Sequence, residues 1–354
     1  MRGFARRRLA TLACLGLLLV LALLAGRGSA AATGAGGPAP LPGATPPGVT
    51  PREVTIRVAM AVDNVYRFSS REKTFSVEGT LRLSAPAAVL GPWLAAGVDP
   101  ITLVRFQNLV EPWDSLLEAS SGPLRLGAYL GRDYRFNGNF YSDEIDYRGY
   151  PFGTLPLQIR LVADPSFPAT VAEPPRIRLE PDRAGSGVSR RSNMNGYRLR
   201  SWRLFPSQGG VEMELLYDPI GWAALVKWLL PLTITMVVML LTPNLRAGFS
   251  SERLAIPPVI LLTLVFMQQA YRDSLPSLPY LTVLDGLYAF SYLVTLVFFC
   301  EFIWCANRLD RLTSEGAGPL HPRLERRIER LELGLQLASL AGYGMQLLWA
   351  LGQR

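Results

Sequence analysis

Four long segments almost free of charged residues dominate the C-terminal part of the 354-residue chain. They cover residues 222–242, 254–272, 281–303 and 333–352. A helix that crosses a bilayer needs about 20 mostly apolar residues, so each segment is long enough to span a membrane. The whole chain is 49% hydrophobic and only 18% charged, whereas soluble domains carry about 25% charged residues. We therefore expect a four-helix transmembrane domain over residues 220–354.

The N-terminus has the composition of an export signal. Three arginines at positions 6–8 precede a long apolar run, and small residues at 28–31 offer cleavage sites. This pattern predicts a secretory signal peptide over residues 1–31; a first transmembrane helix is the alternative interpretation. Residues 32–51 are rich in Pro and Gly and predict a flexible linker. Both interpretations of the N-terminus export the segment that follows.

The arginines between the apolar segments predict the orientation in the membrane. They cluster in the first and third loops, at 243–253 and 307–332, while the loop between the second and third segments holds only Arg272. Basic loops favour the cytoplasmic side. We therefore expect a multi-pass protein of the bacterial inner membrane, with the N-terminal domain and the C-terminus in the periplasm.

Residues 52–219 have the pattern of a β-domain. Stretches that alternate, or that carry β-branched and aromatic residues, are separated by Gly, Pro, Asn and Asp. They lie at 54–65, 74–83, 101–106, 124–130, 155–162, 197–205 and 211–217. The best helix candidate, 87–96, is interrupted by Gly91 and Pro92, so we expect no helix there. Strands at this spacing predict an all-β periplasmic sandwich.

Residue counts exclude several kinds of site. The three cysteines are Cys14, Cys300 and Cys305, all in apolar segments, and the only histidine is His321. The β-domain therefore has no disulfide framework and no cysteine-based zinc site, and a metal site or triad built on histidine is disfavoured. We find no nucleophile–base pair, phosphate loop or metal cluster. The sequence predicts no enzyme, no cofactor and no metal.

The net charge of +8 does not indicate a nucleic-acid partner. Five of the arginines that produce it lie in the first 30 residues, where there are no acidic residues. The excess in the rest of the chain is too small to predict binding to a polyanion.

The region around the second apolar segment carries a specific combination of motifs. An acid–base pair in Ser-Ser-Glu-Arg-Leu (250–254) precedes Leu-Leu (261–262), and Arg-Asp-Ser-Leu-Pro-Ser-Leu-Pro-Tyr-Leu-Thr (272–282) follows. This combination resembles the pore helix and following loop of the pentameric ligand-gated ion channels, the Cys-loop receptor superfamily. Residues 73–84 resemble the family's second strand. Residues 146–152 resemble the loop that carries the disulfide in animal receptors, and its cysteines are absent here, as in prokaryotic members.

The resemblance implies an extracellular all-β sandwich of ligand-binding type, joined to a four-helix transmembrane domain. Such subunits assemble as a homopentamer around a central pore. The partners that it implies are membrane lipid, permeating ions and an unknown small ligand, protons or divalent ions.

The second apolar segment also has the periodicity of a pore helix. Five residues recur at intervals of four and three and share one helical face: Ala255, Val259, Leu262, Phe266 and Gln269. In several copies around an axis, Leu262 and Phe266 would form apolar rings that close the path by dewetting. Five Glu252 carboxylates would attract cations at the inner mouth. The alternative is that this face only packs against other helices and that Glu252 is interfacial.

The resemblance also implies a coupling interface between the two domains. We expect two segments of the β-domain to approach the loop after the second apolar segment. The β-domain residues are Arg71, Glu72, Lys73, Pro151 and Phe152. The residues in the membrane domain are Arg272, Asp273 and Pro276. The family's Pro-Phe-Asp is Pro-Phe-Gly here, and Asp218-Pro219 replace the family's basic residue before the first span. Both charges of the family's interdomain ion pair are therefore missing, so no unpaired charge is left. The coupling route must differ or be weaker.

Aromatic residues near the ligand-capture hairpin offer a weak candidate binding site. Tyr197, Trp202 and Phe205 could form an aromatic wall for a cation, or they are ordinary strand aromatics. The five residues at 206–210 predict a tight hairpin with little reach.

Pro257 and Pro258 lie inside the pore helix itself. They predict either that this helix begins near Ile256, with the preceding residues unwound, or that it kinks.

The resemblance, together with the stripe of the second apolar segment, implies a pentameric ligand-gated channel that prefers cations. It is expected to open to an unknown periplasmic stimulus through a hydrophobic gate. The alternative is a non-conducting or constitutively closed receptor-like membrane assembly that keeps the fold as a binding or sensing module.

Overall fold

The computed structural model describes residues 53–164, 175–189, 192, 194, 196–245, 250–314 and 322–352. The predicted signal peptide and linker, Cys14 and His321 lie outside the described residues. The chain forms two compact units. One is built from strands and contains the described residues up to Ile145 together with Thr154–Asp218. The other holds the helices from Pro219 onward and also the short segment Asp146–Gly153.

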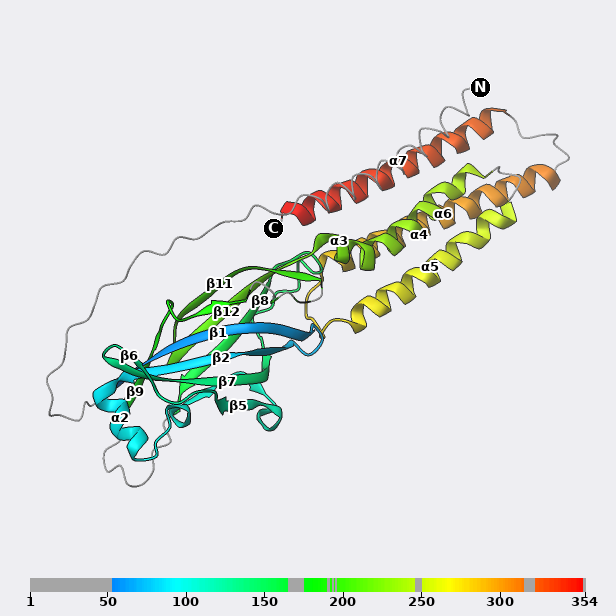
Figure 1. The fold of residues 1–354 in the computed structure, drawn as a ribbon. Helices are drawn as coiled ribbons and strands as arrows, with labels where there is room; N and C mark the ends of the chain where they lie inside the picture. The colour runs from blue at the N-terminus through cyan, green and yellow to red at the C-terminus, as the bar shows by residue number, and fades with distance from the viewer. Residues whose placement is uncertain are drawn as a thin grey trace. The chain divides into compact units, whose positions relative to one another are not determined.

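In the described part of the chain, the strand unit consists of two sheets (Figure 1). The larger sheet has the order β10-β1-β2-β7-β4, with β5 and β6 also paired to β7 and β9 paired to β1. Its strands are β1 (Glu53–Ser69), β2 (Thr74–Pro86), β4 (Leu109–Val110), β5 (Leu116–Ala119), β6 (Leu124–Leu126), β7 (Tyr129–Tyr141), β9 (Arg176–Pro181) and β10 (Gly187–Val188). The smaller sheet, β11-β12-β8-β3, comprises β3 (Val104–Phe106), β8 (Leu155–Ala163), β11 (Tyr197–Ser207) and β12 (Gly210–Pro219).

Both sheets contribute to the apolar core. Val58 and Met60 of β1 are fully buried, as are Met213 and Leu215 of β12. Along β1, buried apolar residues recur at alternate positions, as expected for a strand with one face in a core. The sandwich-like, sheet-rich N-terminal unit that the sequence predicts is confirmed.

Three local predictions for this unit are wrong. The predicted strand 101–106 begins as a 3-10 helix, Pro100–Leu103, and only Val104–Phe106 form a strand. The stretch 124–130 is not one strand but the turn of a hairpin, in which β6 pairs with β7 and Gly127 takes a φ of 64°. A helix, α2 (Ala87–Ala95), forms although it contains Pro92. Burial of Leu90 and a hydrogen bond from the Ala87 amide to the Ala128 carbonyl, at 3.0 Å, anchor this helix. Tertiary contacts therefore outweigh the local proline signal.

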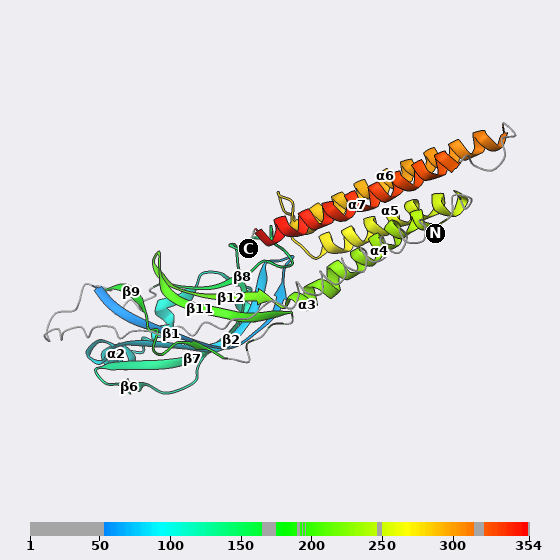
Figure 2. The ribbon, with the colours of Figure 1, turned by 90° about the horizontal axis from the view of Figure 1, so that it is seen from above.

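The helical unit contains α3 (Gly221–Ala224), a π-helical turn (Leu225–Leu229), α4 (Leu230–Leu241), α5 (Ser250–Asp273), α6 (Val283–Ser314) and α7 (Pro322–Gly352). Within it, α5 packs against α4 and α6, and α7 packs against α6 (Figure 2). Three stretches are long and apolar enough to cross a membrane: Leu225–Asn244, Ser251–Asp273 and Val283–Arg308. Helix α7 covers the fourth predicted span, but its glycines and glutamines lower its hydropathy, so its crossing stays a prediction.

Helix α5 is continuous through both of its prolines. The predicted start near Ile256, with an unwound segment before it, is therefore wrong. Each proline removes one backbone hydrogen bond and costs roughly 3 kcal/mol in a helix interior. The first turn is held instead by a side chain, since the Arg253 guanidinium donates to the carbonyl oxygen of Pro243 and to Glu332, each at 2.6 Å.

Candidate functional site

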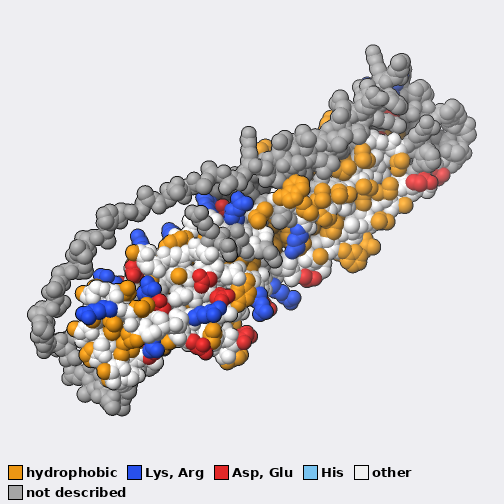
Figure 3. Space-filling view, viewed as in Figure 1, with side chains coloured by type: hydrophobic (Ala, Val, Ile, Leu, Met, Phe, Trp, Pro, Cys, Tyr) orange, Lys and Arg blue, Asp and Glu red, His pale blue; other side chains and the backbone are white. Residues whose placement is uncertain are grey.

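Helix α5 has two faces of opposite character. Its inward face, buried within the chain, includes Ile260, Leu264 and Tyr271. The five residues of the predicted pore stripe, together with Glu252, are all exposed: Ala255, Val259, Leu262, Phe266 and Gln269. Phe266 is 66% exposed and Leu262 57%, so the chain itself covers little of this stripe. Apolar side chains cover much of the visible surface of the helical unit (Figure 3).

Chemical character changes along this exposed face. At the start of α5, Ser251 donates a hydrogen bond to the Glu252 carboxylate at 2.8 Å. The middle is apolar, and at the far end Gln269 donates to Asp273 at 3.0 Å. A carboxylate at one end, large apolar side chains in the middle and polar groups at the other end form a graded surface. Such a surface suits contact with water and ions at its ends and a dry zone between them.

The segment Asp146–Gly153 is bound to the loop between α5 and α6. The Tyr147 amide donates to the hydroxyl of Tyr280 at 3.1 Å, and the Val283 amide donates to the Arg148 carbonyl at 3.0 Å. The Arg148 guanidinium lies 5.2 Å from the ring centre of Tyr280, within range of a cation–π interaction. The ring of Tyr150 packs against that of Tyr271, with their centres 6.0 Å apart. The contact is therefore aromatic and backbone-mediated.

The residues named for the coupling interface in this segment are Pro151 and Phe152, which differ from the residues that make these contacts. Pro151 is buried and Phe152 is half-buried, and the Phe152 amide closes a turn to the Gly149 carbonyl at 2.8 Å. The four tyrosines that make the contacts are not among the named coupling residues. Tyrosines occur in both contacting segments, at 147 and 150 and at 271 and 280. This pattern could have indicated an aromatic contact between the two segments.

A capping box fixes the start of α6. Thr282 accepts a hydrogen bond from the Asp285 amide at 3.2 Å, while Asp285 accepts one from the Thr282 amide at 3.1 Å. Such reciprocal bonds satisfy amides that a helix start leaves without partners. Arg272, one of the predicted coupling residues, pairs with Asp285 at 3.4 Å and so ties the end of α5 to this box. Asp273 is exposed and Pro276 half-buried.

The other predicted coupling residues lie in the strand unit. Arg71, Glu72 and Lys73 form the turn between β1 and β2, where the Glu72 amide donates to Ser69 at 3.2 Å. Their approach to the helical unit stays a prediction. Asp218, at the end of β12, pairs with Arg200 of β11 at 3.7 Å.

Strand β11 carries the three aromatic residues of the weak ligand-site prediction. Tyr197, Trp202 and Phe205 are all half-buried, and burial stops alternating along the strand at Arg200 and Ser201, which are both exposed. Tyr197 packs edge-on against Phe68, at 5.8 Å between ring centres, and the Arg203 guanidinium lies 5.9 Å from the centre of the Phe205 ring. A single wall formed by all three rings stays a prediction. The hairpin turn is tighter than predicted, because β11 and β12 extend to Ser207 and from Gly210.

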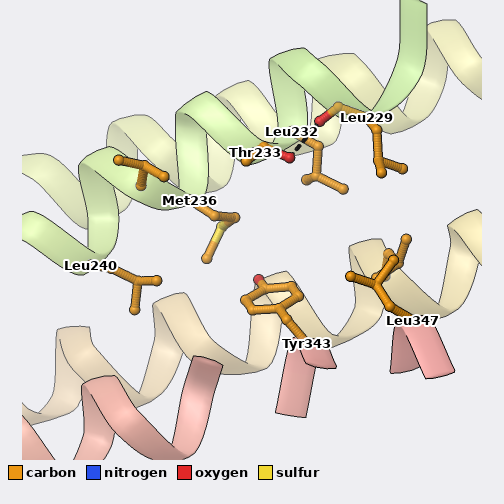
Figure 4. A pocket seen from close by; sticks show the side chains of 9 residues that line it. Leu229, Leu232, Thr233, Met236, Leu240, Tyr343 and Leu347 are labelled. Carbon is orange, nitrogen blue, oxygen red and sulfur yellow. Dashed lines mark hydrogen bonds between the residues drawn. The ribbon is translucent and has the colours of Figure 1, made fainter. Parts of the chain in front are cut away.

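An apolar cavity of about 40 Å³ lies between α4, α6 and α7 (Figure 4). It is lined by Leu229, Leu232, Thr233, Met236, Val237, Leu240, Leu287, Tyr343 and Leu347. Its two hydroxyl groups are already bonded, Thr233 to the Leu229 carbonyl and Tyr343 to Ser291. The cavity offers no free polar group to orient a charged or polar ligand.

Among the described residues, one group could hold a metal ion. It comprises Glu301, Cys305 and Glu332, all buried at the end of the helical unit that contains the start of α5. Sequence analysis missed this group, because Glu332 lies on a different helix from the other two.

No protein-family model matches the chain, and no curated protein matches it significantly.

Proposed function

We propose that this chain is one subunit of a homopentameric ion channel of the ligand-gated type, with α5 lining the pore. The observation that carries the proposal is that the predicted pore stripe coincides with the face of α5 that the chain leaves uncovered. Five residues chosen from sequence periodicity are all exposed, while Ile260, Leu264 and Tyr271 on the opposite face are buried.

The chemistry of this face supports an ion path with a closed resting state. Rings of Leu262 and Phe266 would form a dry constriction, since ions would lose hydration there with nothing to replace it. A ring of Glu252 carboxylates would concentrate cations at one mouth. The proposal includes a cation preference, α7 as a fourth membrane span, an exported strand unit in the periplasm, and gating by a small ligand, protons or divalent ions.

Segment Asp146–Gly153 supports a route by which the strand unit could act on the pore helix. It is continuous with β7 and β8 of the strand unit, and its backbone bonds reach the residues that connect α5 to α6. The missing ion pair of the family is then replaced by aromatic and backbone contacts.

The test is an assembly measurement followed by current recording. The purified chain should give a pentamer by native mass measurement and crosslinking. After reconstitution into planar bilayers it should pass cation-selective current during pH steps or on addition of divalent ions or small amines. A stable dimer or tetramer would contradict the proposal.

A second candidate is the non-conducting receptor-like assembly. The observation that favours it is that Gly153 has no side chain and Asp218 pairs with Arg200 within the strand unit, so neither position supplies the family's coupling charge. A pentamer that stays silent under every stimulus, and also after the Leu262→Ser substitution, would favour this candidate over the channel.

A further inference from the structure

A buried group of charged and nucleophilic side chains ties together the helices at one end of the helical unit. Arg253 comes from the first turn of α5, Glu301 and Cys305 from α6, and Glu332 from α7. None of the four is more than 8% exposed. The Arg253 guanidinium donates to Glu332 and to the Pro243 carbonyl, each at 2.6 Å, so this one cation contacts both α7 and the turn after α4.

Two of these residues form an adjacent pair on one helix face. Glu301 and Cys305 are four residues apart on α6, which stacks their side chains. The Cys305 thiol donates to one oxygen of Glu301 at 2.9 Å. One ligand atom from each of Glu301, Cys305 and Glu332 lies within 4.8 Å of the others. Ligands around a tetrahedral zinc ion are about 3.5 Å apart, so small side-chain rotations would complete such a triangle.

Two buried atoms in this group lack partners among the described residues. They are the second oxygen of Glu301 and the Nε of Arg253. Glu301 is only 7% exposed. One of its oxygens accepts the Cys305 thiol, so its carboxyl group points toward the other members of this buried cluster. A buried carboxyl oxygen without a partner is costly. Its presence indicates a ligand at this position.

The balance of charge indicates a cation. Two carboxyl groups and a thiol face one arginine, so without a further cation the buried site must keep two protons to stay neutral. A divalent cation with Arg253 balances two carboxylates and one thiolate, and its binding releases those two protons. Arg253 bonds only one oxygen of Glu332. The other oxygen is left for a metal, and the arginine fixes the carboxylate orientation, as second-shell partners of metal ligands do.

We propose that Glu301, Cys305 and Glu332 bind one Zn²⁺ ion, with water as the fourth ligand. A thiolate favours zinc or cadmium over magnesium and calcium, which prefer oxygen ligands only. The bound ion crosslinks α6 to α7, and through Arg253 it also holds α5 and the end of α4. This proposal does not depend on whether the protein conducts ions.

Cadmium titration of the purified full chain, freed of metal by a chelator, tests the site directly. Cd²⁺ bound to a thiolate gives an ultraviolet charge-transfer band. We expect one equivalent per chain to produce this band in the wild type and in Cys300→Ser, whose thiol is exposed on the same helix, but not in Cys305→Ser. Glu301→Gln should weaken binding on the order of tenfold or more. Absence of the band in the wild type, or its persistence in Cys305→Ser, would overturn the proposal.

Thiol protection provides a second measurement that leaves all three ligands intact. In a Cys14→Ser/Cys300→Ser variant, Cys305 is the only thiol. Zn²⁺ should slow its alkylation and raise the thermal unfolding temperature, whereas Mg²⁺ should do neither. Alkylation and unfolding that are unchanged by excess Zn²⁺ would refute the site, even if Cys305→Ser failed to fold.

Discussion

The backbone amide of Val283 donates a hydrogen bond to the carbonyl oxygen of Arg148 at 3.0 Å, although the two residues lie far apart in the sequence. Val283 is the first residue of α6, where helix amides have no intrahelical partner. The segment Asp146–Gly153 therefore completes the cap of a membrane helix. Movement of this segment away from Val283 and Tyr280 would break this bond and the neighbouring one between the Tyr147 amide and the Tyr280 hydroxyl.

Replacing Tyr280 by Phe should loosen this contact. The substitution removes the hydroxyl that accepts the Tyr147 amide at 3.1 Å, and the loss of one such hydrogen bond costs about 0.5–1.5 kcal/mol. We expect faster amide hydrogen exchange in the peptide that covers 146–153. Tyr292→Phe is the matched control, because its hydroxyl bonds Gln268 between α5 and α6. Equal exchange of that peptide in the wild type and in Tyr280→Phe would refute a structural role for the Tyr280 hydroxyl.

Removing one partner of the buried Arg253–Glu332 pair should destabilise the helical unit. Their side chains are 4% and 10% exposed, and breaking a buried pair costs about 3–5 kcal/mol because it leaves a charge uncompensated. Glu332→Ala should lower the unfolding free energy by this amount in detergent, and a double Arg253→Met/Glu332→Met variant should recover much of it. The exposed pair Arg105–Asp164 is the control; Asp164→Ala should change stability by less than about 1 kcal/mol.

High pH should weaken the strand unit through Tyr134. Burial, reinforced by the adjacent Asp99 carboxylate, raises the pKa of Tyr134 above its ordinary value of 10.0. Above pH 10 the folded state therefore keeps a proton that the unfolded chain loses. The free energy of unfolding is unaffected below pH 10 and falls as the pH rises above 10. Tyr134→Phe should reduce the loss of stability between about pH 9 and 11. Tyr141→Phe, at a more exposed tyrosine, should leave this pH dependence unchanged. The same slope in both variants would contradict this assignment.

The sequence predicts the parts of this protein that depend on local pattern. Alternation along β1 and the apolar run of α5 are local, and both elements form where expected. Strand β7 was missed because its Asp, Asn and Gly residues have low strand propensity, yet it pairs with β2 over its whole length. Helix α2 was missed because its stability comes from the burial of Leu90. Both errors arise from tertiary contacts.

The two candidate sites also differ in whether they depend on local sequence pattern or on tertiary contacts. Helical periodicity alone predicts that the five residues of the α5 stripe share one face, and all five are exposed. The group of Glu301, Cys305 and Glu332 joins two helices, and no spacing within one segment reveals which faces of these helices meet.

Glu252 should set ion preference if the protein conducts. It is exposed at the start of α5, hydrogen-bonded only to Ser251 among the bonds described, and five carboxylates in a narrow mouth attract cations. In a salt gradient, Glu252→Gln should move the reversal potential away from the value of a perfectly cation-selective pore. Glu329→Gln, which neutralises an exposed carboxylate on α7, should leave it unchanged. A wild-type reversal potential that follows chloride, and does not change with Glu252→Gln, would rule out this role.

The apolar middle of α5 should be the gate, and two leucines with the same exposure allow a matched test. Leu262 on α5 is 57% exposed and Leu293 on α6 is 56% exposed, so serine costs each position a similar loss of apolar surface. Only Leu262 lies on the predicted pore face, one helical turn from Phe266. Leu262→Ser should admit water to the constriction and give a leak current at rest. Phe266→Ala should widen the same constriction. Leu293→Ser should leave the resting current unchanged, because its side chain would face lipid or a neighbouring helix. If the two serine variants behave alike, or if Leu262→Ser alters neither resting current nor response to stimulus, then the exposed face of α5 is a packing surface and the pore assignment fails.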